Sequence, residues 1–119
     1  ALRASRWLRR RGPERVLAPR VPGGEYELLP LLVGRERAWR LASPRLDVDV
    51  AGTGDVVTAV LAASLLRGEP PPRAAERALA GVHAALESTL AHGWEELDVQ
   101  AAAPAAFTEG APRFQAVEV

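Results

Sequence analysis

The chain has 119 residues, of which 48% are hydrophobic and 25% charged, a composition typical of a globular domain, or of part of a larger one, rather than of a disordered segment. Its 15 basic and 15 acidic residues cancel, so no overall field attracts nucleic acid or an anionic membrane surface. The absence of cysteine excludes disulfide and thiolate chemistry, and no apolar run approaches the length of a membrane span, so we expect a cytoplasmic protein.

The first eleven residues predict the end of a helix that stops at Gly12-Pro13, because glycine and proline commonly follow a helix. The apolar stripe of this helix would consist of Ala4, Trp7 and Leu8. Seven arginines fall within residues 1–20. No nucleic-acid-binding motif accompanies them, so we interpret them as a solvated helix face rather than as a phosphate or nucleic-acid patch.

Four short strands are predicted next. They cover residues 15–18, 26–33, 37–42 and 46–50. A turn at residues 34–36 would join the second and third strands as a hairpin, and Pro30 argues for an edge position or a bulge. In the fourth strand apolar residues alternate with Asp47 and Asp49, which places both carboxylates on one face, the solvent one.

Two helices follow a glycine loop at residues 51–55. Residues 56–66 are apolar on all sides, which indicates a buried helix that packs inside a layered structure. Residues 73–92 form an amphipathic helix between Pro72 and Gly93. Its apolar stripe consists of Ala75, Leu79, Val82, Leu86 and Leu90.

The remaining residues predict a strand at 95–99, a short helix at 101–107 and a last strand at 114–119. Strands and helices are therefore mixed around a central strand, glycine loop and helix, which favours an α/β layered fold. On the amphipathic helix His83 lies with Glu76 and Glu87 on the polar side, and we interpret that trio as a solvated face rather than a metal site.

Gly52-Thr53-Gly54-Asp55 carries the candidate chemistry. Two glycines allow an anion to approach the backbone, and the free N–H groups of the following helix favour a phosphate. Asp55, ionised in the first turn, would accept a proton from a hydroxyl while a phosphoryl group is held over the loop. By themselves these four residues fit a tight turn with Asp55 as the helix N-cap better than a catalytic loop.

The wider sequence resembles the C-terminal part of a pyridoxal kinase of the ribokinase-like superfamily. The resemblance lies in DVDVAGTGDVVTAVLAASLLRG, residues 47–68, and in AAERALAGVHAALESTLAHGWEELDV, residues 74–99. In the second stretch the family pattern is matched by Thr89, Gly93 and Glu96-Leu97. The implied fold is the C-terminal portion of a three-layer α/β structure whose central sheet strands are flanked by helices. Its expected parts are residues 1–50 with helix, strands and hairpin, 51–68 with the loop and buried helix, and 73–119 with the amphipathic helix and tail.

The resemblance implies ATP-dependent phosphoryl transfer to the 5′-hydroxymethyl group of pyridoxal, a step of vitamin B6 salvage that yields pyridoxal 5′-phosphate. It implies that Asp55 is the catalytic base and that Gly52, Thr53 and Gly54 form the anion hole for the transferring γ-phosphate. It also implies that four residues line the adenine pocket, although core packing explains them equally well. These four are Leu46, Val50, Val82 and Leu86.

One position departs from the family pattern. Where the family commonly has a Thr-Ser pair that meets the ATP phosphates, this chain has Ala18-Pro19, and our hypothesis is that Arg20 supplies charge instead. The resemblance implies ATP and Mg²⁺ as cofactors, with room for a monovalent cation, and a homodimer of the full-length enzyme.

In the resembled family the acceptor pocket, lid and Mg²⁺ carboxylates come mostly from the N-terminal part, so we expect this chain to be a fragment that is inactive alone. Two alternatives stay open. One is a fragment of another ribokinase-like kinase, acting on hydroxymethylpyrimidine or a sugar. The other is a standalone binding domain without catalysis.

Overall fold

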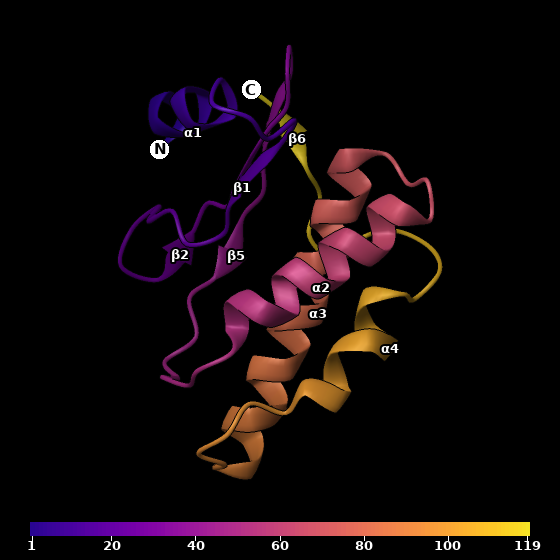
Figure 1. Cartoon of the computed structure of the whole chain (residues 1–119). Coiled ribbons are helices and arrows are strands. Elements are labelled where there is room, and N and C mark those ends of the chain that lie inside the picture. The colour runs from indigo at the N-terminus through magenta and orange to yellow at the C-terminus, as the bar shows by residue number, and fades with distance from the viewer. The chain divides into compact units, whose positions relative to one another are not determined.

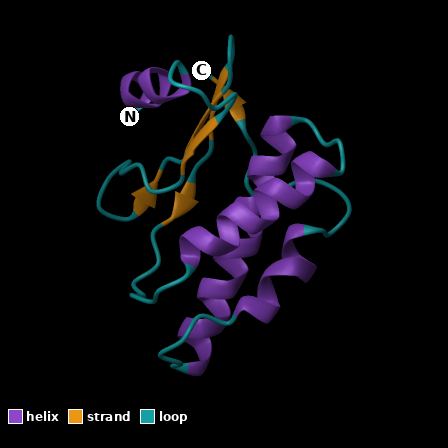
Figure 2. Cartoon of the chain, in the orientation of Figure 1, coloured by secondary structure: helices purple, strands orange, loops and turns teal.

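The computed structural model describes residues 1–119, which form two compact units. Unit 1 comprises Ala1–Arg45 and Gln115–Val119, and unit 2 comprises Leu46–Phe114. The strands lie in unit 1, whereas unit 2 is helical (Figures 1 and 2). None of the helices combines the length and the apolar character needed to cross a membrane.

Unit 1 contains helix α1 (Leu2–Arg9) and two antiparallel sheets. The larger sheet has the order β1-β3-β4-β6, formed by Val16–Ala18, Leu31–Val33, Ala38–Arg40 and Val117–Glu118. The smaller sheet pairs β2 (Glu27–Leu28) with β5 (Ser43–Pro44). The predicted hairpin is confirmed, because Val33 lies opposite Ala38 and the Gly34 N–H donates to the Arg37 carbonyl at 2.8 Å.

The single strand predicted at residues 26–33 is wrong, because the structure divides it into β2 and β3, which belong to different sheets. Pro30 lies between them and has no N–H to continue a strand ladder. Its carbonyl accepts the Leu41 N–H at 2.9 Å, and the preceding Leu29 N–H donates to the Val21 carbonyl at 2.7 Å. Pro30 therefore marks a change of sheet rather than an edge position or a bulge.

The core of unit 1 consists of Leu31, Val33 and Ala38, with Leu2, Ala18 and Val21 packed against it. Helix α1 contacts β1 and β3 through the face that carries Leu2 and the buried Ser5. The predicted stripe of Ala4, Trp7 and Leu8 is therefore wrong: Ala4 is exposed, and Trp7 and Leu8 are 53% and 48% exposed. The Arg11 guanidinium lies 4.0 Å from the centre of the Trp7 ring and shields part of it.

In unit 2, α2 (Thr53–Leu66) and α4 (Ala102–Ala106) both pack on the long helix α3 (Pro71–His92), with the short helix η1 (Val99–Ala101) before α4. The helices approach closely at Gly81. A Cβ at that position would lie 3.1 Å from the Ala106 Cβ and 3.5 Å from the Val60 Cγ2. The alanine-rich sequence thus permits tight helix packing in a small core.

The expectation that the apolar helix is buried on all sides is wrong for α2. Val56, Val57, Val60 and Ser64 face α3 and α4, whereas Ala59, Ala62 and Leu66 are exposed, Leu66 to 88%. Unit 2 contains no sheet, so only one face of α2 is covered within it.

Two predicted strands are absent. Residues 46–50 keep the predicted alternation in burial, with Asp47 and Asp49 exposed, but they form no ladder because no other strand lies beside them in unit 2. Residues 95–99 form a turn that leads into η1. The helices predicted at 73–92 and 101–107 are confirmed as α3 and α4, and residues 114–119 contribute the two-residue strand β6.

A buried arginine ties α3 to the segments around it. Arg77 Nε donates to Glu69 Oε2 at 2.6 Å, and Arg77 Nη1 donates to the Ala106 carbonyl at 2.9 Å and to that of Thr108 at 3.4 Å. The hydrogen bond from Arg77 lowers the pKa of Glu69 below its usual range. This connection, which the sequence pattern did not predict, links α3 with the connector before it and with α4.

Candidate functional site

The candidate site is the N-terminal end of α2. The helix begins at Thr53, three residues earlier than expected, so that Thr53, Gly54 and Asp55 form its first turn. Gly52 precedes it with a φ of 98°, a left-handed conformation that glycine adopts readily. The Val56 N–H donates to the Gly52 carbonyl at 3.1 Å, which closes the first turn. No side chain caps this end, so Asp55 is not the N-cap that the alternative interpretation required.

The geometry leaves the backbone N–H groups of residues 53–55 free to bind a ligand. These groups precede the first intrahelical hydrogen bond, and the positive end of the helix dipole lies there. A Cβ placed on Gly54 would meet no atom within 4 Å, so the surface beside this residue is open. The arrangement fits an anion that accepts hydrogen bonds from consecutive N–H groups.

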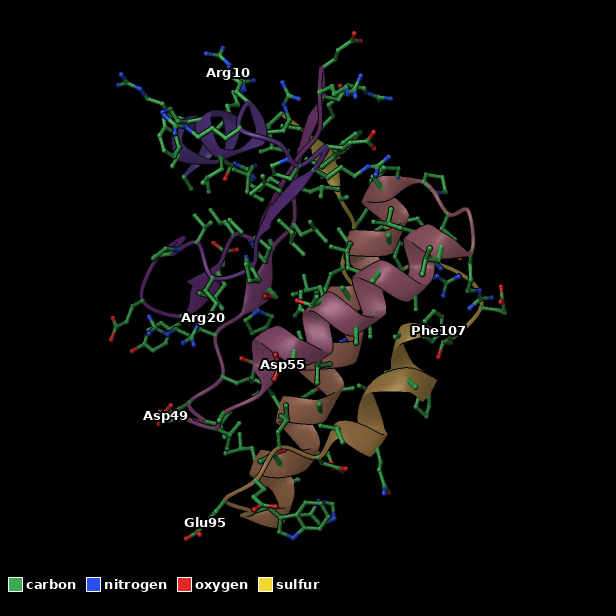
Figure 3. The ribbon with its side chains drawn as sticks, in the orientation of Figure 1. Arg10, Arg20, Asp49, Asp55, Glu95 and Phe107 are labelled. Atoms are coloured by element: carbon green, nitrogen blue, oxygen red, sulfur yellow. The ribbon has the colours of Figure 1, made fainter.

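Asp55 is exposed on the first turn of α2 (Figure 3). Its neighbour Thr58 does not bond to the carboxylate, because the Thr58 hydroxyl donates to the Gly54 carbonyl at 2.8 Å. The carboxylate is therefore accessible to a hydroxyl that approaches the same helix end. Asp49, which precedes the loop, is also exposed and is directed outward in the same view.

The four residues predicted to line an adenine pocket all belong to unit 2. Leu46 and Val50 are half-buried in the segment before α2, Val82 is buried in α3, and Leu86 is half-buried one turn later. Arg20 belongs to unit 1, where it is exposed in the turn that follows β1. The Ala18-Pro19 step that departs from the family pattern thus lies at the end of a strand.

The segment after α3 also borders the candidate site. Residues 93–100, Leu97 among them, line an open hollow of about 740 Å³. A Cβ on Gly52 would lie 3.8 Å from the Leu97 Cδ2, an ordinary van der Waals contact. The sequence pattern matched Thr89, Gly93 and Glu96-Leu97 to the family but gave no role to them; in the structure the Leu97 side chain lies near Gly52.

The interpretation of His83 as part of a solvated face is wrong, because the side chain is buried. Its ring packs edge-on against Phe114 with centroids 5.0 Å apart, and its Nε2 lies 3.9 Å from Glu87 Oε1. Burial, with a smaller contribution from the Arg113 charge, lowers the pKa of His83 below its usual value. Glu87 pairs with Arg113, whose hydrogen bond to it is 2.6 Å long, rather than with His83. His83 therefore serves in packing against Phe114.

No group of three His, Cys, Asp or Glu side chains in the structure is arranged to hold a metal ion. Glu76, the third member of the trio on α3, accepts a hydrogen bond from Arg73 at 3.2 Å and is buried.

Comparison with known proteins identifies similar sequences and folds. No family model matches the chain. It is 35% identical over 95 residues to the pyridoxal kinase PdxY of Rubrobacter xylanophilus, a match that covers 76% of this chain and 33% of that enzyme. The chain thus spans about a third of the length of the curated relative that it matches.

Solved structures of kinases share the fold, among them the following two. A Bacteroides thetaiotaomicron protein assigned as a phosphomethylpyrimidine kinase has a TM-score of 0.83 at 22% identity, with 97% of this chain and 42% of that chain covered. The pyridoxal kinase of Leishmania donovani, solved with ADP and pyridoxine, has a TM-score of 0.81 at 20% identity, with 98% and 43% covered. The ribokinase-like α/β fold and the resemblance to pyridoxal kinases are confirmed.

Proposed function

We propose that this chain is the nucleotide-binding part of an ATP-dependent kinase that phosphorylates the 5′-hydroxymethyl group of pyridoxal. The observation that carries the proposal is the uncapped N-terminus of α2, open beside Gly54, with Asp55 in its first turn. The similarity to a pyridoxal kinase, 33% of whose length is matched, supports it, and so does the match to a kinase solved with ADP and pyridoxine.

In the proposed reaction the substrate hydroxyl attacks the γ-phosphorus of ATP. The bond from that phosphorus to the oxygen bridging the β-phosphate breaks, ADP leaves, and the hydroxyl proton passes to the Asp55 carboxylate. The N–H groups of residues 53–55, exposed by the turn at Gly52, stabilise the charge on the transferring phosphoryl group. Thr53 and Gly54 supply two of these N–H groups and Gly52 forms the turn that exposes them, so we assign these three residues to the anion hole.

The remaining roles concern the nucleotide. We assign Leu46, Val50, Val82 and Leu86 to the adenine pocket, and Arg20 to a phosphate in place of the hydroxyls missing at Ala18-Pro19. Unit 2 carries four Arg against ten acidic residues, so its backbone dipoles rather than its net charge attract a phosphate. Mg²⁺ would enter with the ATP phosphates and reduce their charge.

The likeness to a protein assigned as a phosphomethylpyrimidine kinase favours a second candidate acceptor, hydroxymethylpyrimidine, for the same chemistry. A binding domain without catalysis is the third candidate. The resemblance further leads us to propose that this chain is a fragment and that the complete gene product is a homodimer.

An acceptor assay tests the proposal. We expect the complete gene product to convert pyridoxal and ATP to pyridoxal 5′-phosphate and ADP, with kcat/KM for pyridoxal above that for hydroxymethylpyrimidine. The 119-residue chain alone should show no rate above a control without protein, because the acceptor pocket is not among its residues. A preference for hydroxymethylpyrimidine would select the second candidate. If the complete gene product phosphorylated neither pyridoxal nor hydroxymethylpyrimidine, the third candidate, a binding domain without catalysis, would be selected.

A further inference from the structure

The C-terminal end of α3 is tied to the segment that follows it through Thr89. The Thr89 hydroxyl is fully buried, donates to the Ala85 carbonyl at 2.7 Å and accepts the Asp98 N–H at 2.9 Å. The Thr89 carbonyl in turn accepts the Trp94 N–H at 3.1 Å, across the left-handed Gly93 that ends the helix. Thr89 therefore fixes both ends of the five-residue turn between α3 and Asp98.

A second hydrogen bond strengthens the same connection. Ser88 Oγ donates to Asp98 Oδ2 at 2.6 Å, a short contact of the kind made by a charged acceptor. His92 lies close by, with Nδ1 2.7 Å from the Ser88 carbonyl and 3.4 Å from Ser88 Oγ. In a hydrolase triad the histidine lies between the serine and the acid, whereas here Ser88 lies between Asp98 and His92. These three residues therefore do not form a catalytic triad, and their role is to hold Asp98.

Holding Asp98 also holds its neighbour Leu97 against the glycine loop. Leu97 is half-buried, and its Cδ2 lies 3.8 Å from the place where a side chain on Gly52 would begin. Gly52 adopts the positive φ that starts α2 and directs the N–H groups of residues 53–55 outward. No side-chain cap holds this end of the helix, and the Leu97 side chain lies near Gly52, so Leu97 is placed to restrict the loop from outside α2.

We infer that Thr89 and Asp98 are positioning residues for the phosphate-binding loop, and that they act through Leu97. The inference rests on the proposed function for its catalytic meaning and adds to it: the end of α3 sets the geometry of the anion hole at the start of α2. Displacement of a positioned group by about 1 Å costs a rate on the order of a hundredfold, so such a support matters to catalysis.

Two matched pairs of variants test the inference. Thr89→Val removes the hydroxyl, whereas Thr89→Ser retains it. Leu97→Ala removes the side chain that lies near Gly52, whereas Leu65→Ala truncates an equally half-buried leucine near the other end of α2. The readouts are amide hydrogen exchange in the 119-residue chain and the Kd of the complete gene product for a non-hydrolysable ATP analogue. The Val56 amide reports directly on the first turn, because it donates to the Gly52 carbonyl.

We expect Thr89→Val and Leu97→Ala to speed exchange at Val56 about tenfold relative to amides in the middle of α3, as a local opening does. Thr89→Ser and Leu65→Ala should leave that ratio unchanged. The first two variants should also weaken nucleotide binding about fivefold. A smaller folded fraction raises the apparent Kd only by the reciprocal of that fraction, so a variant that circular dichroism shows to be mostly folded cannot lose fivefold in that way.

The inference is overturned if Thr89→Val and Leu97→Ala leave exchange at Val56 as in the wild type, or if Leu65→Ala raises the ratio equally. If Thr89→Val fails to fold, exchange at Val56 in Leu97→Ala tests the inference by itself, because that substitution removes no side-chain hydrogen bond. Failure of the proposed function has a different signature: the wild-type gene product would not bind the nucleotide analogue, while the exchange pattern would still report the support of the loop.

Discussion

Replacement of Asp55 by Asn is expected to lower kcat of the complete gene product with pyridoxal by about a thousandfold, within the range that a general base contributes. Asn is nearly isosteric but cannot take up the hydroxyl proton at neutral pH. The loop N–H groups remain, so the Kd for ATP should change little. The measurement is steady-state kinetics of pyridoxal 5′-phosphate formation, together with the Kd of the nucleotide.

Asp49→Asn provides the matched control. Asp49 is an exposed carboxylate in the segment before α2, so its replacement removes the same charge without changing the first turn of the helix. Its variant should retain the wild-type rate. An Asp55→Asn enzyme with the wild-type kcat would exclude Asp55 as the base, and an equal loss in both variants would point to the general charge of unit 2 instead.

Replacement of Arg77 by Met is expected to lower the free energy of unfolding by about 3 kcal/mol, the cost of breaking a buried ion pair by removal of one partner. Met preserves the apolar length of the side chain but leaves Glu69 and the Ala106 carbonyl without their donor. Urea unfolding of the 119-residue chain, followed by circular dichroism, measures the change.

Arg67→Met is the control for this prediction. The guanidinium groups of Arg67 and Arg77 lie 5.0 Å and 5.7 Å from the centre of the Phe107 ring, but Arg67 is exposed. Its loss should cost less than about 1 kcal/mol, the magnitude of an exposed cation–π contact. Equal losses for the two variants would mean that the ring contact, rather than the buried hydrogen bonds, holds α3 and α4 together.

Local signals predicted the elements whose ends and periodicity lie in the sequence itself. Helix α3 has proline at its start and glycine at its end, and the turn at residues 34–36 separates two apolar runs, so both were found from the sequence. The strand predicted at 46–50 has the correct alternation but lacks a partner strand, which no local pattern reveals.

Burial was harder to predict, because it depends on which surfaces other segments cover. Helix α2 is apolar on all sides, yet unit 2 covers only the face that carries Val57 and Val60. The opposite error occurs at His83, a polar residue on an apparently polar face that Phe114, thirty-one positions later in the chain, helps to bury. Both outcomes are decided by contacts distant in sequence.

The glycine motif led to the candidate site, but the beginning of the helix was misplaced by three residues. Glycine and threonine are weak helix formers, so residues 52–54 read as loop. In the structure only Gly52 leaves the helical conformation, and Thr53 already belongs to α2. The support from Leu97 could not be predicted, because it depends on how the turn after Thr89 folds back toward Gly52.

A titration of the isotope-labelled chain with a non-hydrolysable ATP analogue and Mg²⁺, followed through the backbone amide resonances, tests the central claim most directly. We predict that the largest shifts fall on the amides of residues 52–56 and that Gly54→Val abolishes them. Valine is the better helix former and its Cβ meets no atom of the chain within 4 Å, so this variant should fold while its side chain crowds the proposed phosphate position. Shifts confined to residues outside the start of α2, or unchanged binding by Gly54→Val, would contradict the assignment of this helix end as the phosphate site.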